Sequence, residues 1–109
     1  MINELFGGET TEKCLIYLAA MEEGYPLEIS KAFGSSNTQV IRTLTKLEQA
    51  SIIIGKEVGR ARIYSLNSRF FVAKELKALL DRVIVNMPLA DQEKYFMRRK
   101  APRKKGKAI

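Results

Sequence analysis

The chain has 109 residues, of which nineteen are lysine or arginine and twelve are aspartate or glutamate, so its formal net charge is +7. This length fits one domain with a single core. The chain has no histidine and only one cysteine, Cys14, which excludes an internal disulfide, the usual Cys/His zinc sites and histidine-dependent catalysis. The apolar run from Cys14 to Met21 is too short for a bilayer, which takes about 20 residues to cross. We therefore expect a cytoplasmic protein with no membrane, metal or cofactor partner.

Positive charge is concentrated at the C-terminus, because residues 98–109 carry seven basic side chains and no acidic one. A segment this basic and this poor in apolar residues predicts a disordered arm that attracts nucleic acid or anionic lipid, or one that only keeps the chain in solution. We predict a folded domain over 1–97 and a DNA-binding tail over 98–109. The basic residues of the tail are Arg98, Arg99, Lys100, Arg103, Lys104, Lys105 and Lys107.

The first third of the chain predicts two helices. Apolar residues at intervals of three and four indicate a helix over 11–23, with Thr10 as its N-cap and Gly24 as its stop. Pro26 fits the first position of a second helix of about two turns, and Gly34 fits the left-handed position that closes it.

A third helix, over 36–50 with its cap, follows directly. Ser36 and Gln39 have the spacing of a capping box. The apolar positions form one narrow stripe of Val40, Leu44 and Leu47. The opposite face is polar and basic and has no acid.

Residues 52–66 predict a β-hairpin, because two β-branched or aromatic runs flank a turn at Gly59. On the second strand Arg62 shares a face with Tyr64 and Leu66. The basic residues of the hairpin are Lys56, Arg60 and Arg62.

A long fourth helix is predicted over 69–87, capped by Ser68, and a short final helix over 89–97. One face of the long helix carries apolar residues at intervals of three and four, namely Ala73, Leu76, Leu80, Val83 and Met87, and Phe71, Val72, Leu79 and Ile84 widen the apolar surface. A single small domain needs less apolar surface than this, so we predict that this face forms a homodimer interface. The alternative is that the helix completes the core of a monomer.

The element order predicts a mainly α fold with a small β-hairpin (α+β), a winged helix-turn-helix with a long C-terminal dimerisation helix. In this fold the third helix enters the major groove and the hairpin, or wing, contacts the backbone or minor groove. The predicted contacts on double-stranded DNA from the third helix are Ser36, Asn37, Thr38, Gln39, Arg42, Thr43 and Lys46, with Arg42 the first candidate for a base contact. The wing adds Lys56, Arg60 and Arg62.

Three segments, 26–34, 36–50 and 59–67, resemble the small winged-helix regulators of the ArsR-like and MarR-like kind. The third-helix pattern of that family matches Ser36, Val40, Arg42, Leu44, Leu47, Glu48 and Ala50, and its wing ending matches Tyr64 and Leu66. The resemblance covers about residues 9–87 and implies the same fold and a DNA-binding function.

Two positions depart from the family pattern. Ser51 stands where the family usually has glycine, so a left-handed backbone there would be strained. The paired Cys or His ligands of the metal-sensing members are absent, which argues against metal sensing. We expect Cys14 to be a small buried hydrophobe, with a redox-sensing thiol as the alternative.

These observations favour a homodimeric, sequence-specific DNA-binding transcriptional regulator, in particular a repressor. One alternative is a protein-interaction or regulatory subunit that uses the winged-helix surface or the apolar fourth helix. Another is a sequence-independent nucleic-acid binder driven by the basic tail. We expect no enzymatic activity, because the carboxylates are scattered and the chain has neither a phosphate-binding loop nor a nucleophile elbow.

Overall fold

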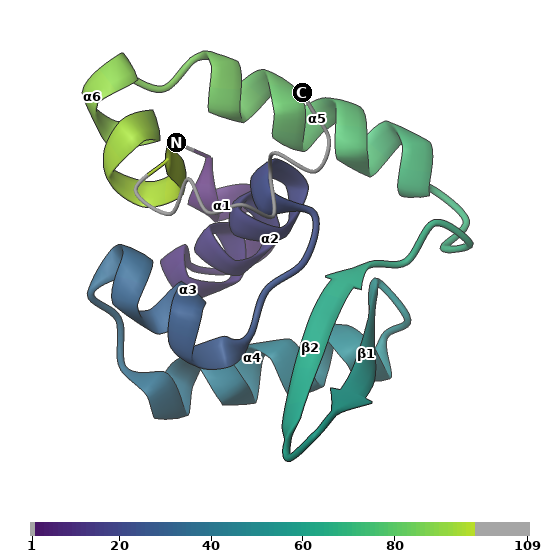
Figure 1. The fold of residues 1–109 in the computed structure, drawn as a ribbon. Coiled ribbons are helices and arrows are strands. Elements are labelled where there is room, and N and C mark those ends of the chain that lie inside the picture. The colour runs from purple at the N-terminus through teal and green to yellow at the C-terminus, as the bar shows by residue number, and fades with distance from the viewer. Residues whose placement is uncertain (1, 98–109) are drawn as a thin grey trace.

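The computed structural model describes residues 2–97, and the predicted basic tail lies outside them (Figure 1). The fold is mainly helical with one antiparallel sheet of two strands, and so belongs to the α+β class. Its elements are α1 (Asn3–Phe6), α2 (Glu9–Met21), α3 (Pro26–Phe33), α4 (Asn37–Gln49), β1 (Ile53–Val58), β2 (Ala61–Leu66), α5 (Ala73–Val85), α6 (Leu89–Gln92) and a π-helical turn (Glu93–Met97). Within residues 2–97, no helix is both long enough and apolar enough to cross a membrane.

Helix α2 forms the centre of the fold. Every residue from Cys14 to Ala19 is buried, because α4, α5 and the hairpin pack on it from different sides (Figure 1). A helix that is apolar all round is stable only inside a core. Burial of each large aliphatic side chain contributes about 1.5–3 kcal/mol to the free energy of folding, so this helix supplies much of the core energy.

The N-terminal end differs from the sequence prediction. Helix α2 begins at Glu9, two residues before the predicted start, and Gly8 stands at the cap position instead of Thr10. The short helix α1 was not predicted. The backbone N–H of Ile2 donates to Oε2 of the buried Glu12 at 2.7 Å, which ties the start of the chain to α2. This contact joins residues ten positions apart, so no local pattern indicates it.

The predicted caps of the next two helices are confirmed in part. Pro26 opens α3, and Gly34 closes it with a left-handed φ of 67°. The Oγ of Ser36 accepts the backbone N–H of Gln39 at 3.3 Å, which satisfies one exposed donor at the start of α4. This is the half of the predicted capping box in which the hydroxyl accepts the N3 amide.

The hairpin is attached to the loop after α2. Its strands pair from Ile53 with Leu66 to Val58 with Ala61. Gly24 and Tyr64 exchange two backbone hydrogen bonds of 2.9 and 3.0 Å, so Gly24 acts as a one-residue third strand. A Cβ at Gly24 would lie 2.7 Å from the ring of Tyr17, so this close approach requires glycine. The prediction that Gly24 stops the helix over 11–23 is wrong, because α2 ends at Met21 and Glu22 is its C-cap.

Helix α5 is shorter than the predicted helix over 69–87. It begins at Ala73, and Ser68 is not its cap. The Oδ1 of Asn67 accepts the N–H of Arg69 at 3.0 Å, while its Nδ2 donates to the carbonyl of Ser51 at 2.9 Å. This tethered side chain holds residues 68–72 in turns and delays the helix by four residues.

The predicted dimer face of α5 lies mostly inside the single chain. Leu80 and Met87 are buried, and Leu76 and Val83 pack half-buried against the core, with Ala73 half-buried at the start of the helix. These residues cover the apolar part of α2, which is buried from Cys14 to Ala19. The assignment of Leu80 and Met87 to a dimer interface is therefore wrong, and this face completes the core of the monomer.

The C-terminal helices fold back onto α2 and α3. The ring of Tyr95 lies 4.5 Å from that of Phe33, and the ring of Phe96 lies 6.3 Å from those of both Phe33 and Tyr17. Aromatic pairs at these separations add to the energy of simple burial. The predicted final helix over 89–97 is therefore present as α6 and the π-helical turn, anchored by an aromatic cluster.

Ser51 has a left-handed backbone with φ of 65°, the conformation that is strained for a residue other than glycine. We expect Ser51→Gly to raise the free energy of unfolding by about 1 kcal/mol, because the substitution removes the clash between Cβ and the backbone. The carbonyl that Asn67 binds is kept. Denaturant unfolding measures the change. Ser65→Gly, on the extended strand β2, is the control and should lower stability; a loss of stability in both variants would show that residue 51 is unstrained.

Candidate nucleic-acid interface

The outward face of α4 carries most of the side chains predicted to read DNA. Asn37, Thr38, Gln39, Arg42 and Lys46 are all exposed, whereas Thr43 is half-buried on the flank of the apolar stripe. Sequence reasoning missed Thr45 and Gln49, which are exposed one and two turns beyond Arg42 at helical spacings of three and seven. It also missed Ile41, whose side chain is 44% exposed on this helix.

Two hydroxyl groups of α4 are occupied within the helix itself. Ser36 accepts the amide of Gln39 as the N-cap, and the Oγ1 of Thr45 donates to the carbonyl of Ile41 at 2.8 Å. Ser36 therefore orients the first turn of the helix. Its predicted role in DNA contact stays a prediction.

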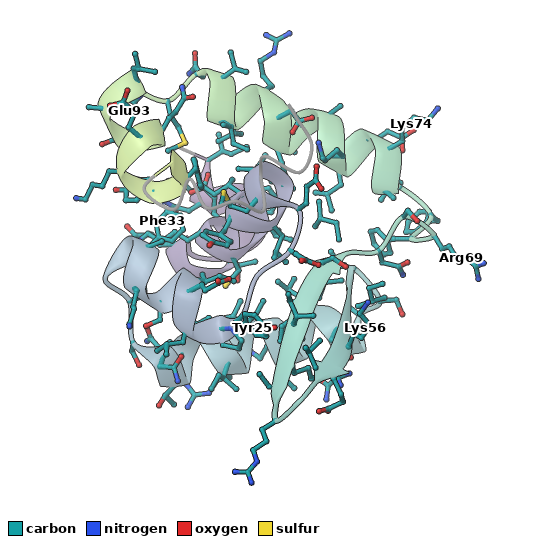
Figure 2. All side chains as sticks on the ribbon, in the orientation of Figure 1. Tyr25, Phe33, Lys56, Arg69, Lys74 and Glu93 are labelled. Atoms are coloured by element: carbon teal, nitrogen blue, oxygen red, sulfur yellow. The ribbon has the colours of Figure 1, made fainter. Side chains whose placement is uncertain are left out.

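The basic residues of the hairpin point in different directions. Residues paired across an antiparallel ladder share a face. Glu57 pairs with Arg62, while Lys56 pairs with Ile63 on the other face. Arg60 lies in the turn at the tip. In Figure 2, Lys56 and Tyr25 lie on opposite sides of the hairpin.

Arg62 is held by two carboxylates. Its Nη2 lies 2.5 Å from Oε2 of Glu48 on α4, and its Nη1 lies 3.1 Å from Oε2 of Glu57. Hydrogen bonding to Glu48 is the largest reason that the pKa of Arg62 is raised above its usual value. The guanidinium also lies 5.9 Å from the centre of the Tyr64 ring. Its charge is thus balanced within the protein.

Gly55 makes room for this arrangement. A Cβ at Gly55 would lie 2.6 Å from Nε of Arg62 and 3.0 Å from the ring of Tyr64. Because Gly55 faces Tyr64 across the ladder, the arginine can pass over it toward α4. The ion pair between Arg62 and Glu48 therefore links the hairpin to α4.

We expect Arg62→Ala and Glu48→Ala each to lower the thermal midpoint by a few degrees, because this partly exposed pair is screened by water. The exchange variant with Arg62→Glu and Glu48→Arg should recover part of the loss, since it restores opposite charges between the two positions but places a carboxylate opposite Glu57. Scanning calorimetry of the single and double variants measures the coupling. Strictly additive effects would mean that the two side chains do not interact.

The charged groups of α4 and the hairpin are mainly positive, with five bases against two acids. The acids are Glu48 and Glu57, both bound to Arg62. Figure 1 shows α4 and the hairpin tip along one side of the molecule and α5 along the other. Arg42 and Lys46 are exposed on α4, and Lys56 and Arg60 are exposed on the hairpin.

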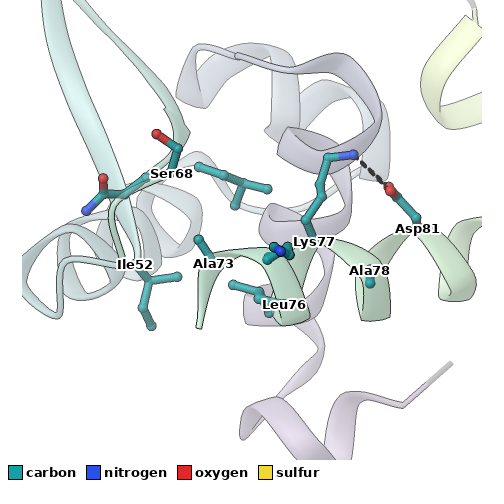
Figure 3. Close-up of a pocket in the computed structure, with 10 residues that line it drawn as sticks. Ile52, Ser68, Ala73, Leu76, Lys77, Ala78 and Asp81 are labelled. Carbon is teal, nitrogen blue, oxygen red and sulfur yellow. Dashed lines mark hydrogen bonds and ion pairs between the residues drawn. The ribbon is translucent and has the colours of Figure 1, made fainter. Parts of the chain in front are cut away.

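A groove of about 600 Å³ lies between the base of the hairpin and α5. Its walls are largely apolar and include Ile52, Leu66 and Leu76 (Figure 3). Lys77 and Asp81, 2.9 Å apart, form an ion pair beside it. The hairpin contacts α2 and α4, and the Gly24 bridge and the ion pair between Arg62 and Glu48 tie it to the rest of the fold.

Cys14 is fully buried. Burial raises the pKa of its thiol to about 12, so the reactive thiolate is scarce at neutral pH. This environment fits the expected structural role and not a redox sensor. Among residues 2–97, no three side chains of the metal-binding types lie together.

No protein-family model matches the sequence, and no curated protein matches it at a significant level.

Proposed function

We propose that the protein is a homodimeric, sequence-specific DNA-binding transcriptional regulator of the winged helix-turn-helix type. The observation that carries the proposal is the exposed polar face of α4 next to a basic hairpin tip on the same side of the molecule. An α-helix fits the major groove of B-DNA, where each base pair presents a distinct pattern of donors and acceptors. Bound near a promoter, the protein would repress transcription by occupying the site.

The side chains of α4 match the chemistry of base edges. The guanidinium of Arg42 can donate two hydrogen bonds to a guanine, and the amides of Asn37 and Gln39 can pair with adenine. The exposed Ile41 offers an apolar surface to a thymine methyl group. These groups supply sequence preference in the proposed complex.

The remaining basic side chains supply affinity that is independent of the DNA sequence. Lys46, Lys56 and Arg60 have no ion-pair partner among the described residues, so they can neutralise phosphates. Arg62 already has two carboxylate partners. In this proposal it acts as a positioning residue that fixes the wing against α4. The tail over 98–109 adds further non-specific attraction.

Selection of random-sequence duplexes by the full-length chain tests the function at about 150 mM salt, where weak phosphate contacts are suppressed. The proposal predicts enrichment of one motif, with affinity for it well above that for a shuffled duplex. Binding without any enriched motif would mean a sequence-independent nucleic-acid binder. No binding at all would favour the role of a protein-interaction subunit.

A further inference from the structure

The outer face of α5 is uncovered by the described elements. The helix packs on α2 through the side that carries Leu80, and Figure 1 shows it along the edge of the molecule. At 100° per residue, the positions opposite Leu80 recur at intervals of three and four. They are Glu75, Ala78, Arg82 and Val85, all exposed, and the exposed Leu79 lies on the flank of this stripe.

Large apolar groups stand at both ends of this stripe. Val85 is 74% exposed at the C-terminal end, and Phe71 is 87% exposed in the turn that leads into the helix. Leu79 is exposed near the middle. Single exposed apolar side chains are ordinary, but three of them on one helix and the turn before it indicate a surface that another molecule covers.

The charges on the stripe are arranged symmetrically. Glu75 and Arg82 each lie 3.5 residues from the midpoint between Ala78 and Leu79, which is about 5 Å along the helix axis. Neither forms an ion pair with another described residue. Across a two-fold axis at the midpoint, Glu75 would face the partner's Arg82, and the reverse pair would form as well. By the same symmetry Val85 lies over the start of the partner's α5, the end that Phe71 leads into, so the stripe is complementary to itself.

We propose that this face binds a second copy of the chain, with the two α5 helices antiparallel and Ala78 and Leu79 at the axis. The inference rests on the proposed function, because it assigns an interface to the homodimer proposed there. The proposed interface is the outer face of α5. The face predicted from the sequence is the opposite one, which is buried within the monomer. Because α4 lies on the other side of α2 (Figure 1), the dimer leaves its DNA-reading face accessible.

Sedimentation velocity of the full-length chain without DNA, over concentrations up to about 100 μM, tests the interface. Glu75→Arg places only positive groups at the two charged positions, and Arg82→Glu places only negative ones. We expect the wild type to dimerise and each variant to dimerise about tenfold or more weakly, because like charges then face each other. An equimolar mixture of the two variants should form a heterodimer, since each supplies the charges that the other lacks.

Glu93→Arg makes the same charge change in the turn after α6 and should leave the dimer intact. Circular dichroism confirms that each variant is folded. A monomeric wild type, or a dimer that persists in both single variants, would overturn the inference. Dimerisation without DNA binding would leave this inference standing and remove the proposed function. DNA binding by a monomer would overturn this inference together with the homodimeric part of the proposed function, and would leave its DNA-binding part.

Discussion

Replacement of Leu80 by alanine is expected to lower the free energy of unfolding by about 3–4 kcal/mol. Leu80 is 0% exposed and fills the contact between α5 and α2. The substitution removes the energy of burying the side chain and leaves a cavity that the surrounding helices close only in part. For a domain of this size such a loss lowers the thermal midpoint by more than 10 °C, by the usual scaling of about 4–8 °C per kcal/mol.

Urea unfolding followed by circular dichroism measures this effect. Leu27→Ala is the matched control, because Leu27 is an exposed leucine on α3 and should change stability by less than about 1 kcal/mol. If Leu80→Ala left the stability of the monomer unchanged, the inner face of α5 would not be part of the core. Its residues would then be open to a second copy, as the sequence pattern alone suggested.

Replacement of Arg42 by alanine is expected to weaken binding to the selected duplex about 10- to 100-fold, since a bidentate contact with guanine contributes about 1–3 kcal/mol of discrimination. Binding to a shuffled duplex should fall far less. Arg42 is exposed on the outward face of α4 and makes no ion pair with a described residue. The substitution should therefore leave the fold intact.

Fluorescence anisotropy titrations over a range of salt concentrations measure the affinity for the selected duplex and for the shuffled duplex. Lys46→Ala should weaken binding to both duplexes alike and reduce the salt dependence by about one unit of slope, as a phosphate contact does. Lys74→Ala is the control, because Lys74 projects from α5 on the other side of the molecule (Figure 2). Equal losses on the selected and shuffled duplexes for Arg42→Ala would mean that Arg42 binds phosphate and reads no base.

Local sequence patterns predicted the central helices and the hairpin because their determinants are local. The spacing of Val40, Leu44 and Leu47, the proline that opens α3 and the glycine that closes it each act within a few residues. The start of α5 was predicted wrongly because Asn67 is tethered to Ser51, sixteen residues away. The helix α1 was missed for the same kind of reason, since Glu12 holds it from the next helix.

For the candidate site, periodicity identified the outward face of α4 but not its relation to the hairpin. The ion pair between Arg62 and Glu48 joins residues fourteen positions apart. The sequence alone therefore grouped Arg62 with the other basic residues of the hairpin. Periodicity also located an apolar stripe on α5 without saying which neighbour covers it. Because α2 is apolar on all sides from Cys14 to Ala19, that stripe packs against it in the core, and the opposite face of α5 remains uncovered.

An NMR titration of the isotope-labelled, full-length protein with the selected duplex tests most directly whether α4 and the hairpin tip form the DNA-binding surface. The proposed function predicts that the largest changes in amide shifts fall in residues 37–46 and 56–60, with the outer face of α5 unaffected. Changes confined to residues 98–109, with α4 and the hairpin unmoved, would contradict it and assign the binding to the basic tail.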